Sequence, residues 1–334
     1  ADIFAPVERA PERTLERLAE IPGVNAVEGR VTGMALVEIK DELIPIRAQA
    51  VSLPEHGPAR LNDIFLAEGR MPNPDRSEEV LLLKGFADAR ALKPGARLSA
   101  TMNGARRSFH VTGLAQSPEF LYTTAPGELV PDDARFAVLW MSRDALAAAY
   151  DMQGAFNEAL IGLERGVSET AILDAVDGVL DPLGGLGAYG LADQQSNFFI
   201  TEEINGARST SVSVPPIFLG VSAFLLYIVI NRIVQAEREE IGLLKAFGYT
   251  NWEVSAHYLK LMLVIAIGGA VFGSGLGIVS GRAMAGLYQE YYKFPFLVFE
   301  LEPRSFVLGL AISVVAACAG GFGVLRGVFR LSPA

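Results

Sequence analysis

The apolar positions of this 334-residue chain follow two patterns, which change about two thirds of the way along it. Before that point, short apolar runs of strand or helix length alternate with polar turns, as in a mixed globular domain. After it come three apolar runs, at 214–233, 261–281 and 306–325. Each has the length, about 20 residues, that a helix needs to cross roughly 30 Å of hydrocarbon. The pattern predicts an α+β domain over 1–205 and an all-α three-helix transmembrane domain over 206–334.

A buried helix in a soluble core is the alternative interpretation of each apolar run. Three such runs in the last part of one chain favour membrane spans over that alternative. The composition agrees, since the chain is 51% hydrophobic and its mean hydropathy is +0.31.

The first 205 residues predict helices and strands that form one or two subdomains. Strands are expected from the apolar positions of 24–37 and over 78–83, 135–141 and 157–163. Helices are expected over 11–21, 84–92, 142–150 and 168–180, the last two with Ser142 and Ser168 as N-caps. Asn103-Gly104 predicts a two-residue hairpin turn between two strands.

Basic residues predict the orientation in the membrane, because short cytoplasmic loops are enriched in lysine and arginine. Arg232, Arg238, Lys245 and Lys260 lie between the first and second runs, whereas only Lys293 lies clear of the runs between the second and third. Residues 234–260 and the C-terminal tail are therefore expected in the cytoplasm, and residues 1–213 outside. An outside domain ahead of three spans leads us to expect a further span before Ala1. The tyrosines and phenylalanines of 287–303 are typical of a membrane interface.

Candidate chemistry is sparse in this sequence. A net charge of −10 argues against a nucleic-acid partner, and a single cysteine, Cys318, excludes an intramolecular disulfide. The three histidines, His56, His110 and His257, are too scattered to predict a metal site. No ionisable residue lies near the middle of an apolar run, which argues against an ion pathway through the spans.

Two further motifs have competing interpretations. Gly185, Gly187 and Gly190 have GxGxxG spacing, but they follow a predicted helix rather than a strand, which favours a flexible turn over a dinucleotide site. The pairs Asp132-Asp133 and Glu202-Glu203 are adjacent in sequence, so their side chains diverge and solvated surface is the favoured interpretation. The sequence has no GxxxxGK[ST] phosphate loop, so any ATP is expected on another chain.

The polar segment after the first apolar run has strong local signals. The sequence predicts one helix that continues from residue 214 to Phe247, with Ile241, Leu244 and Phe247 on one face. Gly248 is expected to end that helix in the left-handed conformation. Thr250 and Glu253 match a capping box that starts the next helix.

Four glycines recur at every fourth position of the second apolar run. Small residues on one helical face allow close approach of another helix in lipid, which predicts a packing face. The alternative is simple tolerance of glycine in membrane helices. The residues are Gly269, Gly273, Gly277 and Gly281.

The segment 235–254, "QAEREEIGLLKAFGYTNWEV", resembles the cytoplasmic segment of FtsX-like ABC transporter permeases. Residues 92–114 resemble the periplasmic domain of MacB-type members, and the terminal "RLSPA" resembles the end of their repeat. The chain is most similar to the first repeat of a large two-repeat permease without its first span. The resemblance implies a multi-pass protein of the bacterial inner membrane, with residues 1–213 in the periplasm.

The resemblance also implies a mechanism in which the permease transmits the motion of a cytoplasmic ATPase dimer to its periplasmic domain. ATP would bind that dimer, and this chain would need no cofactor and catalyse nothing. Other implied partners are a second permease repeat or subunit, a periplasmic adaptor or lipoprotein, and membrane lipids. Contact with the ATPase is carried over to Glu237, Arg238, Glu240, Ile241, Leu244, Lys245, Phe247 and Gly248.

Three functions remain open at this point. The complex exports or handles lipids, lipoproteins or other hydrophobic compounds, or it regulates a periplasmic cell-wall hydrolase and transports nothing. A membrane enzyme is the third, and it is disfavoured because no nucleophile–base arrangement is apparent.

Overall fold

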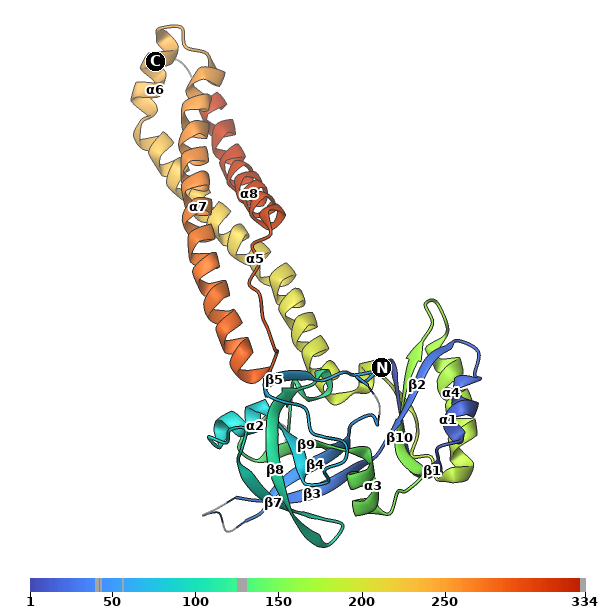
Figure 1. Ribbon diagram of the computed structural model, residues 1–334. Coiled ribbons are helices and arrows are strands. Elements are labelled where there is room, and N and C mark those ends of the chain that lie inside the picture. The colour runs from blue at the N-terminus through green and yellow to red at the C-terminus, as the bar shows by residue number, and fades with distance from the viewer. Residues whose placement is uncertain (40–41, 43, 56, 125–130, 331–334) are drawn as a thin grey trace. The chain divides into compact units, whose positions relative to one another are not determined.

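The computed structural model describes residues 1–39, 42, 44–55, 57–124 and 131–330, with the backbone alone for 322–330. The described chain forms two compact units. The first consists of Ala1–Glu202 with Gln289–Leu297, and the second of Glu203–Tyr288 with Val298–Ala334. Figure 1 shows the sheets of the first unit and the long helices of the second.

A four-stranded antiparallel sheet forms one part of the first unit. Its order is β11-β1-β10-β2, and α1 and α4 pack against one face of it (Figure 1). The core between them includes Ile3, Leu18, Phe156 and Val176, all nearly or fully buried. The elements are β1 (Ile3–Pro11), α1 (Thr14–Ala19), β2 (Val24–Arg30), β10 (Ala155–Leu163), α4 (Glu169–Leu180), η2 (Asp181–Leu183), β11 (Tyr189–Gly190) and η3 (Leu191–Asp193).

A seven-stranded sheet forms the other part, in the order β5-β8-β6-β9-β4-β3-β7. The long strand β8 also pairs with β7, so the hydrogen-bonded ring closes. Every residue of β6 and β9 is buried, which explains their continuous apolar runs in the sequence. The elements are β3 (Thr32–Glu38), β4 (Ile46–Ser52), β5 (Phe65–Gly69), β6 (Glu79–Leu83), α2 (Lys84–Ala89), β7 (Arg97–Met102), β8 (Ala105–Gln116), η1 (Pro118–Phe120), β9 (Phe136–Met141) and α3 (Arg143–Tyr150).

Most of the local predictions for the first unit hold. Asn103 and Gly104 have φ of 46° and 77° and join β7 to β8. The Ser142 hydroxyl accepts a hydrogen bond from the Ala145 N–H and caps α3, whereas Ser168 precedes α4 without a side-chain cap bond. The predictions did not include β1, which contains Pro6, a residue type that is unusual in an inner strand.

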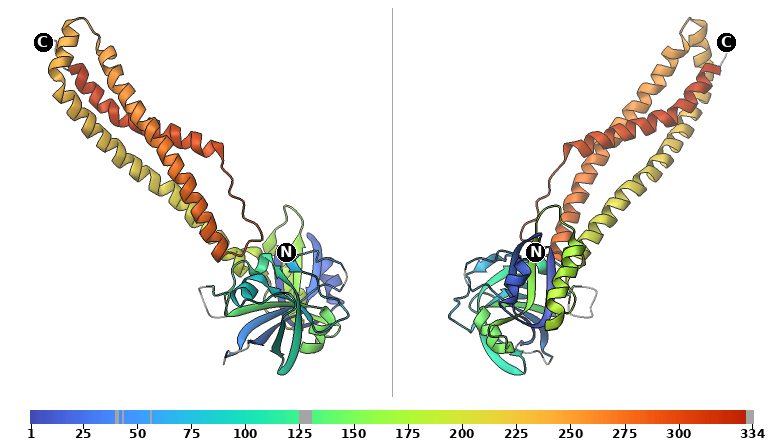
Figure 2. Two further views of the ribbon diagram at one scale, coloured as in Figure 1. Left: turned by 60° about the vertical axis from the view of Figure 1, so that its left-hand side comes forward. Right: turned by 90° about the vertical axis from the view of Figure 1, so that its right-hand side faces the viewer.

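Three long helices make up most of the second unit (Figure 2). Each is long and apolar enough, by length and composition, to cross a membrane over Gln195–Ala236, Asn251–Tyr291 and Pro303–Gly321. The predicted order of an α+β domain followed by three apolar helices is confirmed. The elements are α5 (Gln195–Ala236), α6 (Arg238–Ala246), α7 (Asn251–Tyr291) and α8 (Pro303–Arg330).

The first long helix differs from the prediction at both ends. It starts at Gln195 rather than near residue 214, and its 42 residues span about 63 Å. It continues through Pro215 and Pro216. Its end is at Ala236, because Glu237 has φ −92° and ψ 12° and separates it from α6. The prediction of one unbroken helix to Phe247 is therefore wrong, because the helix is interrupted at Glu237.

Glycines of α8, rather than those of α7, make the close helix contacts within this chain. A Cβ on Gly320 would meet the backbone oxygen of Ala223 in α5 at 2.5 Å, and one on Gly321 would overlap Met262 of α7. A Cβ on Gly269, Gly273 or Gly277 would meet nothing within 4 Å, and one on Gly281 would meet the Phe299 ring at 3.0 Å. The predicted glycine face of α7 thus leaves three positions open in the described part of the chain.

We expect Gly320→Leu to destabilise the three-helix unit by about 1–3 kcal/mol, since the added side chain must push α8 away from the α5 backbone. Thermal denaturation of the full chain in detergent would show a lowered midpoint. Gly309→Leu is the matched control on the same helix, because a Cβ there meets nothing within 4 Å. Equal midpoints for the two variants would show that the Gly320 contact does not hold the helices together.

Candidate functional site

The turn between α6 and α7 is fixed by two capping motifs. Gly248 has φ +95°, and its N–H donates to the Lys245 carbonyl while the Tyr249 N–H donates to the Leu244 carbonyl. This pair of bonds is a Schellman motif. The Thr250 hydroxyl then accepts from the Glu253 N–H at 3.3 Å, and the Glu253 carboxylate accepts from the Thr250 N–H at 2.8 Å. The predicted glycine stop and capping box are both present, and they make the turn rigid.

Apolar side chains are exposed around this turn, which we call the tip. Phe247 is 75% exposed and Trp252 67% exposed. The remaining exposed apolar residues of the tip are Leu243, Leu244 and Tyr249. Large apolar side chains gathered at one exposed site are typical of a protein-binding surface.

Ile241, predicted to share one face with Leu244 and Phe247, is buried whereas those two are exposed. It is 2% exposed and packs in a cluster with Val234 of α5 and Val254 and Tyr258 of α7. Steps of three residues turn a helix by about 300°, so Ile241, Leu244 and Phe247 spread over about 120° rather than one line. Ile241 therefore stabilises the tip from within, while Phe247 and Leu244 face outward.

The charged residues of the predicted contact set lie around the same turn. Glu237 accepts a hydrogen bond of 2.6 Å from the Tyr258 hydroxyl, which ties the break between α5 and α6 to α7. Arg238 and Glu240 are exposed on the first turn of α6. Lys245 is half-buried, and burial lowers its pKa. The structure thus brings all eight predicted residues to one hairpin, with Ile241 inside it.

Gly248→Ala is expected to destabilise the tip by about 1–2 kcal/mol, because a Cβ is disfavoured in the left-handed conformation. The amide of Tyr249, which closes the Schellman motif, should then exchange its hydrogen about 5–30 times faster. Gly206→Ala in α5 is the control, since it has open space and no positive φ. Unchanged exchange at Tyr249 would show that Gly248 does not hold the turn.

The first turn of α5 is bonded to the segment around η1 in the first unit. The buried Ser196 hydroxyl donates to the Glu119 carbonyl at 2.7 Å and accepts from the Tyr122 N–H at 3.1 Å. Gln194 donates to the same Glu119 carbonyl at 3.0 Å, and Gln195 donates to the Thr124 hydroxyl at 2.6 Å. We call this set of bonds the α5 anchor. It fixes the start of a long helix to the domain beside it.

The Glu119 side chain extends the α5 anchor to the four-stranded sheet, where Arg30 ends β2 and Glu158 lies in β10. Its carboxylate accepts two bonds from Arg30, at 2.7 and 2.6 Å, and Arg30 also donates to Glu158 at 2.8 Å. Burial alone would raise the pKa of Glu119, but the charge and hydrogen bonds of Arg30 hold it below its ordinary value. Burial likewise opposes the charge of Arg30, and the two carboxylates raise its pKa instead. This buried ion triad has no signal in the sequence, because Arg30 and Glu119 are 89 positions apart.

The segment Gln289–Leu297 packs against the same unit. Lys293 forms an ion pair with Asp133 at 2.7 Å, and its carbonyl accepts from the Gln116 amide at 2.9 Å. Tyr292 lies 5.7 Å from the Tyr122 ring, and Phe296 lies 6.5 Å from the Phe65 ring, between ring centroids. These aromatic residues, expected at a membrane interface, therefore contact protein. Asp133 is paired rather than a solvated surface group, which corrects that interpretation.

The histidines, the glycine-rich segment and the Glu202-Glu203 pair do not lie together in one site within the described residues. His110 and His257 lie in different units, and His56 lies outside the described residues. In the part of the chain that the structure describes, no three His, Cys, Asp or Glu side chains gather as metal ligands would. Gly185 bridges to Val7 and Gly190 belongs to β11, so the glycine-rich segment pairs with β1, and only the short η3 comes after it. Glu203 accepts a hydrogen bond from the Tyr288 hydroxyl.

Comparison with known proteins identifies the second unit. Residues 212–333 match the model of the family described as "FtsX-like permease C-terminal". The chain is also 26% identical over 132 residues to the "Cell division protein FtsX" of Bacillus anthracis. That match covers 39% of this chain and 44% of the relative, so the chain spans less than half of the relative's length.

Solved structures similar to this chain include two extracytoplasmic regions. The periplasmic region of MacB from Actinobacillus actinomycetemcomitans has a TM-score of 0.36 at 10% identity, and the match covers 61% of this chain and 92% of that one. The extracellular domain of the transporter YknZ from Gram-positive bacteria has a TM-score of 0.35 at 11% identity, covering 54% and 92%. The match over the helices is the most specific of these similarities: residues 212–333 resemble the C-terminal domain of the FtsX-like permeases.

Proposed function

We propose that this chain is the permease part of an ATP-driven ABC complex, and that the tip between α6 and α7 docks on its cytoplasmic ATPase. The exposed Leu243, Phe247 and Trp252 on a doubly capped turn are the observation that supports this most strongly. An apolar surface of this kind is costly in water unless a partner covers it. The charges of Arg238 and Glu240 beside it would orient that partner.

The same proposal includes a path for motion. Displacement of the tip would move α5 through the cluster around Ile241 and the Tyr258–Glu237 bond. The long helix α5 would then act on the α5 anchor, whose buried Ser196 and Arg30–Glu119 bonds would transmit the displacement to the four-stranded sheet. Substrate need not pass between the spans, which agrees with their apolar centres. ATP hydrolysis would belong to the separate subunit.

The orientation follows from the basic residues of the tip region. Arg232, Arg238 and Lys260 place the tip in the cytoplasm by the positive-inside rule. Residues 1–213 then face the periplasm of a bacterial inner membrane. Export or the handling of a hydrophobic compound, lipid or lipoprotein is the activity we favour.

Purification of the full chain from the membranes of its source bacterium tests the proposal. We expect an ATP-binding subunit to copurify in stoichiometric amount, and mass spectrometry would identify it by its phosphate-loop sequence. Purification of the folded chain without any ATP-binding protein would contradict it.

A second function is favoured by the similarity to a cell division protein. In that function the complex transmits ATP-driven motion to a periplasmic cell-wall hydrolase and moves no substrate. Affinity purification with the full chain separates the two: a cell-wall hydrolase supports regulation, whereas a lipid, lipoprotein or adaptor supports transport.

We also propose that the open glycine face of α7 receives a second permease repeat or subunit. Gly269, Gly273 and Gly277 have no neighbour from the described chain to occupy their surface. Gly273→Leu should therefore leave this chain folded but separate it from the second half, as size-exclusion chromatography would show. A complex that is unchanged by Gly273→Leu would contradict this role.

A further inference from the structure

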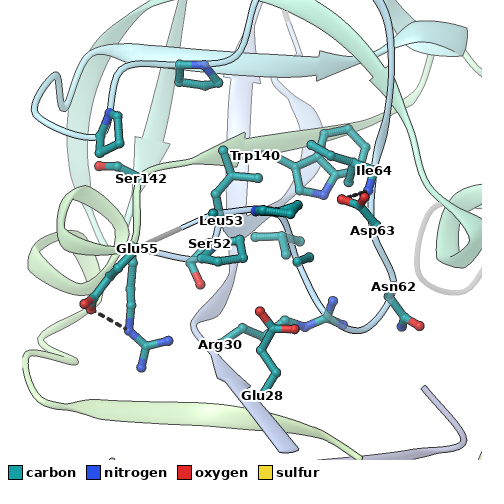
Figure 3. Close-up of a pocket in the computed structure, with 18 of the residues that line it drawn as sticks. Glu28, Arg30, Ser52, Leu53, Glu55, Asn62, Asp63, Ile64, Trp140 and Ser142 are labelled. Carbon is teal, nitrogen blue, oxygen red and sulfur yellow. Dashed lines mark hydrogen bonds and ion pairs between the residues drawn. The ribbon is translucent and has the colours of Figure 1, made fainter. Parts of the chain in front are cut away.

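An open pocket of about 610 Å³ lies in the first unit, and Arg30 and Glu119, which support the α5 anchor, form part of its lining. Its walls come from the end of β2, the segment after β4, the loop that precedes β6 and the start of α3 (Figure 3). The volume is in the range of roughly 300–1,000 Å³ that small-molecule sites occupy. It is large enough for a drug-sized ligand.

The inner wall of the pocket is apolar. Trp140, Val51 and Leu160 are 2–3% exposed, and the half-buried Leu53 and Ile64 complete this surface. Figure 3 shows Trp140 and Ile64 together on one side of the pocket. Such a wall suits an aromatic or aliphatic group, because burial of apolar surface is favourable.

The charged lining of the pocket is strongly acidic. Of its described residues, six are acidic and two are arginines. Both arginines are engaged: Arg30 binds Glu119 and Glu158, and Arg143 contacts Glu12, Glu55 and the Gly29 carbonyl. An anionic ligand would therefore find no arginine without a carboxylate partner among the described lining residues.

Two carboxylates of the lining remain available to a cation. The Glu28 carboxylate accepts only the backbone N–H groups of Arg60 and Leu61 among the described residues, and Asp63 accepts that of Ile64. Figure 3 shows Asp63 on the side of Trp140 and Ile64, and Glu28 beside Arg30 on another side of the pocket. A cation between them would meet opposite charge close to an apolar wall.

We propose that this pocket binds an amphipathic cation, with its ammonium or guanidinium group near Glu28 and Asp63 and its apolar body against Trp140. The arrangement combines a few polar groups with a mainly apolar wall, as ligand sites do. Ligand binding in this pocket requires neither ATP nor the ATPase. This proposal is therefore tested independently of the docking of the tip on the ATPase.

The probes 4-phenylbutylamine, 4-phenylbutanol and 4-phenylbutanoate test the proposal, because they share one apolar body and differ in charge. The full chain would be placed in phosphatidylcholine nanodiscs as the Trp252→Phe variant, so that Trp140 is the one remaining tryptophan. Trp140 fluorescence would then report binding at the pocket. We expect saturable binding of the amine with a Kd at least about tenfold lower than that of the carboxylate.

Substitutions of acidic lining residues test which carboxylates recognise the positive charge of the amine. Glu28→Gln with Asp63→Asn should reduce the preference for the amine at least about fivefold, while Glu164→Gln with Asp174→Asn, both on the exposed surface, should leave it unchanged. Unfolding midpoints would show whether each variant is folded, and Asp75→Asn with Asp144→Asn gives a second pair from the pocket lining. The absence of saturable amine binding, equal binding of the three probes, or a preference that survives both pocket pairs would overturn the proposal.

Discussion

Arg30→Met is expected to lower the free energy of unfolding of the first unit by about 3–5 kcal/mol, since it leaves two carboxylates buried without their cation. The side chains of Arg30, Glu119 and Glu158 are only 10%, 8% and 12% exposed. The same change removes the support of the α5 anchor, because Glu119 also holds Ser196 through its carbonyl. Urea unfolding followed through Trp140 fluorescence in a Trp252→Phe background measures the effect.

Arg106→Met is the matched control for the loss of a charge pair. Arg106 pairs with Glu38 on the surface, where its side chain is 68% exposed, so we expect a loss of less than about 1 kcal/mol. If Arg30→Met costs no more than Arg106→Met, the buried ion triad does not hold the four-stranded sheet and η1 together.

Leu244→Asp with Phe247→Asp is expected to weaken binding of the ATPase subunit at least about 30-fold, which corresponds to roughly 2 kcal/mol. Both side chains face outward from a rigid turn, and a carboxylate in their place would need to be desolvated on docking. Titration of the purified ATPase subunit onto the full chain in nanodiscs, by a surface-binding assay, gives the two dissociation constants.

Met34→Asp is the control for that pair, because Met34 is 52% exposed on β3 in the other unit. It should leave the affinity unchanged. Ile241→Asp should instead destabilise the hairpin itself, since Ile241 is buried. If the Leu244/Phe247 double variant binds the ATPase with wild-type affinity, the tip is not part of the docking surface.

The sequence predicted the features that depend on neighbouring residues. The hairpin turn at Asn103-Gly104, the stop at Gly248 and the capping box at Thr250 each follow from backbone geometry within four residues. The three apolar helices follow from length and hydropathy in the same way. Such signals do not require knowledge of the tertiary fold.

Features that depend on distant contacts were missed or misjudged. Strand β1 is stabilised by pairing with β10, about 150 residues later in the chain, which outweighs the presence of Pro6. Ile241 is buried because α7 packs on one side of α6, and no pattern within α6 shows which side that is. Tyr292 and Phe296 contact the first unit although aromatic residues beside a span are equally typical of a membrane interface.

Site-specific crosslinking from the tip tests the central claim most directly. With Cys318→Ser, which removes the one native cysteine, Phe247→Cys would carry a benzophenone maleimide in the assembled complex. Glu302→Cys, at an exposed position before α8, provides the comparison. We expect the ATP-binding subunit to crosslink to the probe at residue 247 and not to the probe at residue 302. Crosslinking from residue 302 alone, or from neither position in an intact complex, would contradict it.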